Sequence, residues 1–300
     1  MGALVNLMSL PQDLGWYLLM DMVIAIALLG FMWWVSSLFL KGRNNKELTQ
    51  KENFAYGISV SGRLLGLALV LVGGVVNSRT DNFLDSALTV LEFGVLGIVL
   101  IKIGRYAHDK LILYQLDKDS LIRDRNAGIA LVDAASSVAT ALVVQSVMMW
   151  AKGHDGNAVV AIISGFLVCQ TILLTVTRLY ERRFADANRT GSLQRSLENG
   201  QLALAVQHSG HLLGTALAVT ATGSLLEYNP VGYVSNLTSW LIVGLILTLV
   251  LSLLVALAKC IVLANVDLVQ EIDHQNNVGV ASVELALSLG IAFILKGLLG

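Results

Sequence analysis

The segment NFAYGISVSGRLLG, residues 53–66, contains the pattern that decides the fold. A polar amide, Asn53, opens a long apolar run that carries one charged residue, Arg63, near its centre. The same design returns in three further segments: NAGIALVDAASSVA (126–139), QLALAVQHSGHLLG (201–214) and NVGVASVELALSLG (277–290). The four amides are 73, 75 and 76 residues apart, so each unit is long enough for two membrane-spanning helices. The chain is therefore predicted to use one helical hairpin four times.

Composition places these hairpins in a membrane. Of the 300 residues, 55% are hydrophobic and 14% are charged, and the mean hydropathy of +0.71 is too high for a soluble domain. The apolar runs are long and do not alternate, which argues against strands. We predict an all-α polytopic membrane protein with eight transmembrane helices, packed as a pseudo-symmetric bundle with the even-numbered helices inside. The expected spans are 16–40, 54–76, 86–106, 127–150, 157–179, 202–226, 236–262 and 278–299.

The distribution of Lys and Arg predicts the orientation. Basic residues follow the odd-numbered spans, within 41–51, 102–125 and 178–195 and at Lys259, whereas the alternate loops contain only Arg79 and Lys152. By the positive-inside rule the basic loops are cytoplasmic and both termini are periplasmic. The first apolar run is too long for the core of a cleavable signal peptide, so we expect a retained span.

Polar residues recur on one side of each even-numbered helix. Counting from the repeat amide as position zero, positions 7, 10, 11 and 14 fall within a sector of roughly 100°. This sector contains the intramembrane residues Arg63, Asp133, His208, His211 and Glu284. Charges at this depth are costly unless they are paired or hydrated. We therefore expect one interior cluster, in which Arg63 bonds to Asp133 or Glu284 and His208 or His211 completes the group.

Three interpretations of this cluster remain open. Polar side chains can simply hold membrane helices together, or they can line a hydrated path for a proton or small ion. A metal site formed by His208, His211 and an acid is the third, although the spacing of the two histidines is not a motif by itself. We predict neither a bound metal nor a cofactor.

The other repeated residues have structural and functional interpretations as well. The amides Asn53, Asn126, Gln201 and Asn277 are suited to cap helices, and could instead line a cytoplasmic vestibule. The late glycines are predicted to be sites of close helix packing; they are Gly66, Gly214 and Gly290. An acidic-aliphatic pair such as Glu47-Leu48 or Glu271-Ile272 precedes the amide and predicts a short amphipathic helix there.

The pattern of an acidic-aliphatic pair, an amide and a small-and-aliphatic helix with a late glycine resembles the YjfL-type inner-membrane proteins, the domain-of-unknown-function family 350. It is clearest in KELTQKENFAYGISVSGRLLG and QEIDHQNNVGVASVELALSLG. Short members of that family have two hairpins, so the resemblance implies a tandem duplication with units 1–150 and 151–300. It also implies a bacterial inner-membrane location and a role in the envelope, and it brings no catalytic residues with it.

The sequence does not favour an enzyme. It has no P-loop, GxSxG, HExxH or dinucleotide-binding motif in a suitable context. The net charge of −1 gives no basic field for nucleic acid, and the two cysteines, Cys169 and Cys260, give no metal-binding spacing. We predict a non-enzymatic membrane component that passes a small ion through its polar core. The alternative is a scaffold or stress sensor whose basic loops recruit a cytoplasmic protein; either could form homo-oligomers in the lipid bilayer.

Overall fold

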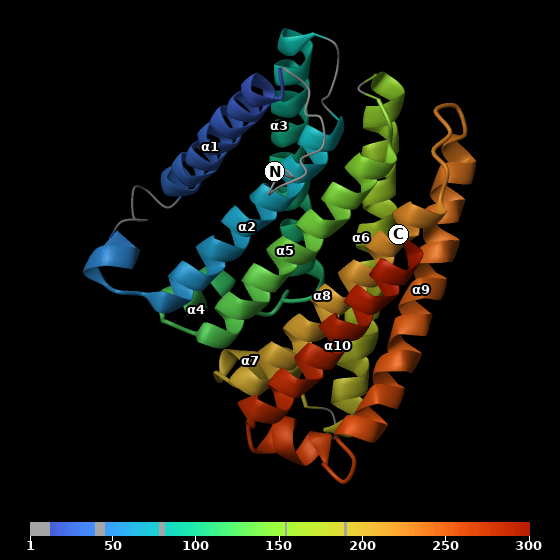
Figure 1. Cartoon of the computed structure of the whole chain (residues 1–300). Helices are drawn as coiled ribbons and strands as arrows, with labels where there is room; N and C mark the ends of the chain where they lie inside the picture. Colours follow the sequence, from blue (N-terminus) through green and yellow to red (C-terminus); the bar gives the residue numbers. More distant parts are fainter. Residues whose placement is uncertain (1–12, 40–45, 78–81, 154, 189–190) are drawn as a thin grey trace, which may run out of the picture.

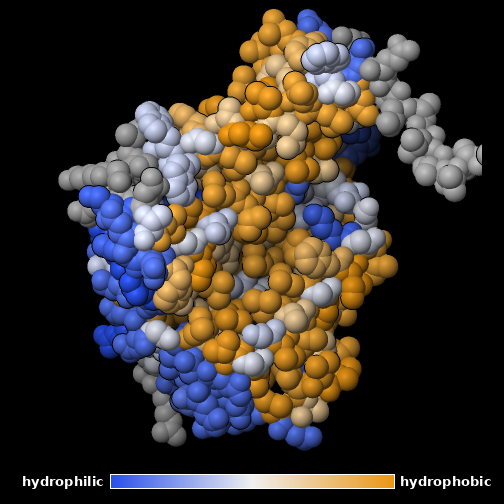
Figure 2. Space-filling view, turned by 60° about the vertical axis from the view of Figure 1, so that its left-hand side comes forward, coloured by the Kyte–Doolittle hydropathy of each residue, from blue (hydrophilic) through white to orange (hydrophobic). Residues whose placement is uncertain are grey.

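The computed structural model describes residues 13–39, 46–77, 82–153, 155–188 and 191–300, and within these ranges it contains helices and no strand. Eight helices are long and apolar enough to cross a membrane, which confirms the predicted class and number of spans. They are α1 (Leu14–Phe39), α2 (Phe54–Asn77), α3 (Phe83–Leu111), α5 (Ala127–Trp150), α6 (Gly156–Ala187), α8 (Leu202–Leu225), α9 (Tyr233–Val262) and α10 (Val278–Leu299). Figure 2 shows hydrophobic residues over most of the visible face, with hydrophilic residues gathered toward the left and bottom.

The transmembrane helices form two layers. The second helices of the four hairpins, α2, α5, α8 and α10, lie side by side in that order and run in the same direction (Figure 1). The first helices α3, α6 and α9 stand behind this row, each in contact with two of its members, and α1 packs on α2 and α3 at one end. This arrangement corrects the expected bundle: α5 and α8 are inside, whereas α2 and α10 are the two ends of an open row. We call it the even row.

Four short helices connect the layers at one end of the molecule. They are η1 (Lys46–Gln50), α4 (Lys118–Arg123), α7 (Leu193–Glu198) and η2 (Val269–His274), and we call this end the stub end. Each short helix is followed by a residue with a positive φ directly before the repeat amide: Glu52, Arg125, Gly200 and Asn276. Only glycine adopts this conformation without cost, so the sharp turn into the even row is strained in three of the four hairpins.

The amides begin the helices of the even row and also join neighbouring hairpins. The side-chain oxygens of Asn53, Asn126 and Asn277 each accept a hydrogen bond from the backbone N–H three residues later, as N-caps do. The Asn53 amide nitrogen donates to the carbonyls of Ile122 and Arg123, at the end of the next hairpin's short helix. Asn126 donates in the same way to the carbonyls of Leu197 and Glu198. The amides therefore cap their own helix and brace it against the next hairpin.

Gln201 departs from this scheme in a way that its longer side chain explains. It makes no capping bond to α8, but its nitrogen reaches the Asp273 carbonyl of the next hairpin at 3.1 Å. The missing cap comes from Asn276, whose side-chain oxygen accepts a hydrogen bond from the Ala203 N–H. Asn276 therefore caps α8, and Gln201 makes the bond to the next hairpin.

Glycines allow the close approach within the even row. A Cβ at Gly62 would lie 2.4 Å from the Ala134 Cα, and Gly66 faces the Ser137 carbonyl in the same α2–α5 contact. Gly214 faces Ser288 between α8 and α10. The sequence predicts a packing site at Gly290 too, but no described atom lies within 4 Å of its Cβ position. The reason is its place on α10, because the row ends there and no further helix covers that side.

Candidate functional site

A buried carboxylate, Asp133 on α5, is the centre of a polar cluster in the first half of the chain. Its Oδ1 accepts hydrogen bonds from Arg105 and from Lys118, each at 2.8 Å. Its Oδ2 accepts a 2.5 Å bond from the Ser59 hydroxyl and lies 3.7 Å from the Arg63 guanidinium, which itself donates to Ser59 at 2.6 Å. The carboxylate is only 1% exposed, so three cations and a hydroxyl replace the water it would otherwise bind. We call these five residues the first cluster.

A second buried carboxylate, Glu284 on α10, has a similar environment in the second half. It forms an ion pair with Lys259 of α9 and accepts a hydrogen bond from the Gln207 amide of α8. The Tyr180 hydroxyl of α6 in turn donates to the Gln207 side-chain oxygen. His211 stacks near Tyr180, with ring centroids 4.7 Å apart, and lines the same cavity as Glu284. We call these five residues the second cluster.

The two clusters are built on the same positions of the repeat. Asp133 and Glu284 both lie seven residues after the amide, on the second even helix of their half. Each is bonded by a polar residue six positions after the preceding amide, Ser59 in one half and Gln207 in the other. Each is also paired with a cation near the stub end of the helix behind, Arg105 or Lys259. A carboxylate, a cation and a neutral donor thus form one repeated site.

Two histidines connect the clusters through the middle of the molecule. His108 on α3 and His208 on α8 have ring centroids 6.1 Å apart, and His208 lies 5.6 Å from the Tyr180 ring. Both histidines are buried, and none of their four ring nitrogens has a hydrogen-bond partner among the described residues. His108, His208 and Tyr180 thus form a row of neighbouring rings that reaches the second cluster, where the Gln207 amide joins Tyr180 to Glu284.

The structure does not bring the five predicted residues into one cluster. Arg63 pairs with Asp133, whereas Glu284 and His211 belong to the second cluster and His208 lies between the two. The even row explains the division: Arg63 is on α2, next to α5, and the two helices α5 and α8 separate it from the α10 helix that carries Glu284. No group of three or more His, Cys, Asp or Glu suited to a metal occurs in the described ranges, so the metal interpretation gains no support.

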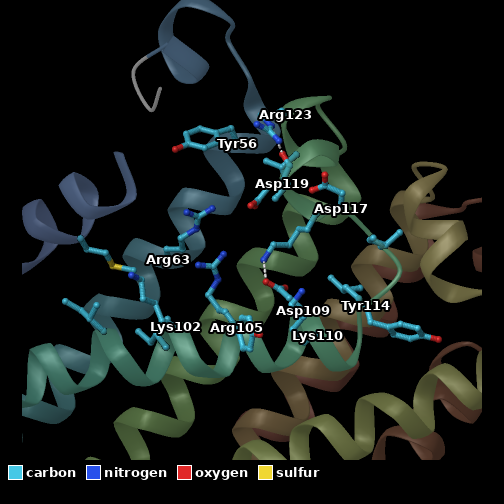
Figure 3. A pocket seen from close by; sticks show the side chains of 18 of the residues that line it. Tyr56, Arg63, Lys102, Arg105, Asp109, Lys110, Tyr114, Asp117, Asp119 and Arg123 are labelled. Atoms are coloured by element: carbon cyan, nitrogen blue, oxygen red, sulfur yellow. Dashed lines mark hydrogen bonds and ion pairs between the residues drawn. The ribbon is translucent and has the colours of Figure 1, made fainter. Parts of the chain in front are cut away.

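Each cluster borders a cavity at the stub end. The first cavity has a volume of about 440 Å³ between α1, α2, α3 and α4, and it contains Arg63, Arg105 and Lys118 in its wall (Figure 3). The second cavity has a volume of about 290 Å³ between α6, α8, α9, η2 and α10, and it contains His211, Lys259 and Glu284. The two cavities share no lining residue in the described part of the chain.

Beyond the clusters the core is mainly apolar, with single buried polar groups such as Thr222 and Asn236. In the half of the molecule away from the stub end, α5, α6 and α9 bury large side chains against one another, among them Val147, Met148, Trp150, Phe166 and Trp240. The Trp150 and Trp240 rings meet edge to face, with centroids 5.4 Å apart. This packing fills the space between α5, α6 and α9 on the side away from the stub end.

Sequence reasoning misses seven of the twelve site residues. In the sequence, Arg105, Lys118 and Lys259 read only as orientation signals, and nothing singles out Ser59, Gln207, His108 and Tyr180. One signal was available: Ser59 and Gln207 occupy the same repeat position, which an aligned comparison of polar residues would have shown. The cations on α3 and α9, Arg105 and Lys259, do not occupy equivalent repeat positions, because the segments between them and the next amide differ in length.

The fold and its charged interior define a multi-pass helical membrane protein made of two similar halves. Comparison with known families gives the same division. The family model described as Domain of Unknown Function (DUF350) matches residues 7–148 and again residues 155–299. The chain belongs to this family and contains its domain twice in tandem. No curated protein and no solved structure matches the chain.

Proposed function

We propose that this chain is a non-enzymatic protein of the bacterial inner membrane that passes protons by way of the buried carboxylates Asp133 and Glu284. The repeated site carries the proposal: each half holds one buried carboxylate bonded to a cation and a neutral donor. Glu284 lines the second cavity, and Asp133 lies behind the wall of the first, where its partners Arg105 and Lys118 line it. Ionisable groups within a membrane core are costly, and acids and histidines in series are typical of proton pathways.

The side chains between the carboxylates support protons over larger ions. Buried imidazole and phenol groups can accept and release a proton without moving far, whereas a hydrated ion needs a continuous aqueous route. The described cavities share no lining residue, and the far half of the core is mainly apolar. The conformation therefore fits a state that exchanges protons with the cytoplasm through the stub end, and passage requires the helices to repack.

The contacts of the basic residues favour this proposal over recruitment of a soluble partner. Recruitment needs exposed positive side chains in the connecting segments. Instead, Arg105 and Lys118 are bonded to Asp133 inside the molecule, and Lys259 is paired with Glu284. These three charges are thus taken up by the two clusters, whereas Arg123, Arg125 and Arg195 stay exposed and keep recruitment as the alternative.

Proton flux into vesicles that contain a pH-sensitive dye would test the proposal. Purified protein is reconstituted, a potassium diffusion potential is applied, and the internal pH is followed. Glu284→Gln keeps the shape of the side chain and a bond to Gln207, but the amide cannot carry a proton at neutral pH. The flux should therefore fall to the level of protein-free vesicles. The matched control is Ser282→Ala, on the exposed side of the same helix.

Two results would contradict proton passage. One is a wild-type flux no greater than that of protein-free vesicles, with the protein shown to be inserted and monodisperse before reconstitution. The other is undiminished flux in Glu284→Gln, or in the double variant Arg63→Met, Asp133→Leu, which removes the first carboxylate and one of its cations together.

A further inference from the structure

The first cavity contains more positive charge than its own acids neutralise. Its wall includes six Lys or Arg side chains: Arg63, Lys102, Arg105, Lys110, Lys118 and Arg123. Only three acids line it: Asp109, Asp117 and Asp119. Figure 3 shows Arg63 and Arg105 extending into the same space from α2 and α3. An excess of cations in a partly enclosed, membrane-embedded cavity is unfavourable unless an anion compensates it.

Two of the three acids in the wall are already engaged. Asp109 is bonded to Lys118, and the Asp117 side chain caps α4 by accepting a hydrogen bond from the Ser120 N–H. Asp133, behind the wall, accepts direct hydrogen bonds from Arg105 and Lys118, while Arg63 donates to Ser59 and lies 3.7 Å from the Asp133 carboxylate. The Nε atoms of Arg63 and Arg105 are buried and have no acceptor among the described residues. The two guanidinium groups thus retain donor capacity for a ligand.

The second half provides an internal comparison, because it has the same architecture without the excess charge. His211 occupies the position of Arg63, ten residues after the amide. The second cavity is lined by two cations, Arg183 and Lys259, and by two acids, Asp273 and Glu284. The fold alone therefore does not require a cation-rich cavity. The surplus charge is a property that only the first half has acquired.

From this asymmetry we infer that the first cavity binds an anion that carries a phosphate group. Guanidinium groups bind phosphate oxygens through paired hydrogen bonds, and lysines add charge at the rim. The volume of about 440 Å³ falls within the range of small-molecule sites. The wall also contains apolar side chains from α1 and α3, namely Phe31, Met32, Ile98 and Ile101. Two sources have this chemistry: the headgroup of an anionic phospholipid and a soluble phosphate ester.

This binding site goes beyond proton passage and is tested separately, by thermal unfolding of the full chain in neutral detergent. The probes are phosphatidylglycerol, phosphatidylcholine, glycerol phosphate and inorganic phosphate. At saturation a specific ligand should raise Tm by about 5 °C. Stabilisation by phosphatidylglycerol but not by the soluble phosphates assigns the lipid headgroup, and the reverse assigns a soluble ligand. Phosphatidylcholine is the control for a lipid without net charge.

Variants then assign the effect to the cavity. Arg63→His introduces the residue of the second half, and Lys102→Gln and Arg123→Gln remove charge at the rim. Each should weaken binding about tenfold, as expected for the loss of one charge-assisted contact. Arg182→Gln, an exposed arginine on α6 that does not line the cavity, should bind as the wild type does. Comparing three variants guards against the misfolding of any one of them.

The inference is overturned if none of the phosphate-bearing probes stabilises the wild type, or if Arg182→Gln loses as much affinity as the cavity variants. These outcomes are distinct from failure of the proposed function. Proton flux without phosphate binding would leave the proposed function standing and remove the anion site. Phosphate binding without flux would keep the site and remove the proposed function.

Discussion

Ser59 and Gln207 occupy equivalent positions of the repeat and make equivalent hydrogen bonds, although their side chains differ. Both lie six positions after an amide, and both donate a hydrogen bond across the even row to a buried carboxylate seven positions after the next amide. The longer Gln207 side chain bonds Glu284 and also accepts the Tyr180 hydroxyl, whereas Ser59 accepts the Arg63 guanidinium instead. The same repeat position therefore binds the buried carboxylate in each half, through a different hydrogen-bond network.

Replacing Ser59 by alanine should destabilise the first cluster. The hydroxyl is 0% exposed, and its bond to a charged acceptor is worth about 2 kcal/mol. Thermal unfolding in detergent should therefore show a lower Tm for Ser59→Ala than for Ser61→Ala, because Ser61 is exposed on the same helix. Equal Tm values for the two variants would show that the Ser59 bond adds nothing to stability.

Alanine at two glycines should have opposite effects. At Gly62 the new Cβ would meet the Ala134 backbone at 2.4 Å, so α2 and α5 must separate, at a cost of about 1–3 kcal/mol. At Gly290 the Cβ meets no described atom, and alanine favours a helix by about 1 kcal/mol. We expect a lower unfolding temperature for Gly62→Ala and an unchanged or higher one for Gly290→Ala. A loss of stability in the second variant would mean that another chain covers α10.

The turn before α2 offers a stabilising substitution. Glu52 has a φ of 48° and an exposed side chain, so Glu52→Gly should relieve backbone strain and stabilise the protein by about 1 kcal/mol. Glu52→Ala retains the Cβ and is the control, with little change expected. The free energy of unfolding, measured with a denaturant that leaves the micelle intact, distinguishes the two. If both variants behave alike, strain at this turn is negligible.

Stability should depend on pH through Glu47, which lies in η1 outside the transmembrane helices. Burial raises the pKa of this carboxyl, but its hydrogen bonds with Lys51 and Asn53 lower it more, so the folded pKa is below the ordinary value of 4.5. A lowered folded pKa stabilises the protein above pH 4.5, and this contribution disappears as the pH falls through the folded pKa. The Tm difference between wild type and Glu47→Gln should therefore shrink between pH 7 and pH 3. A constant difference would exclude this linkage.

The predicted orientation can be tested by cysteine labelling. Glu227 and Gln275 are exposed at opposite ends of the molecule, and the basic segments lie at the Gln275 end. In a Cys260→Ser background, Glu227→Cys should react with a membrane-impermeant reagent in intact cells. Gln275→Cys should react only after the membrane is permeabilised. The reverse pattern would place both termini in the cytoplasm.

The sequence was sufficient for the hairpins, because apolar runs and repeat amides are local signals. It was not sufficient for the pairing of Asp133 with Arg105 and Lys118. These cations lie 28 and 15 residues away in the chain, and basic residues near span ends occur whether they face water or fold back into the protein. The expected single cluster failed for a related reason. Repeat positions define the depth of a residue along a helix, but only packing decides that α2 neighbours α5 and does not reach α10.

The open ends of the even row have a consequence for how such chains change in length. A closed ring of helices fixes its number of members by geometry, whereas an open row adds each hairpin by the contact that joined the previous one. Gene duplication can therefore lengthen the protein without redesigning its interior, as the two matched segments illustrate. After duplication, one copy can keep the ancestral chemistry while the other diverges, and the arginine of the first half opposite the histidine of the second records such a divergence.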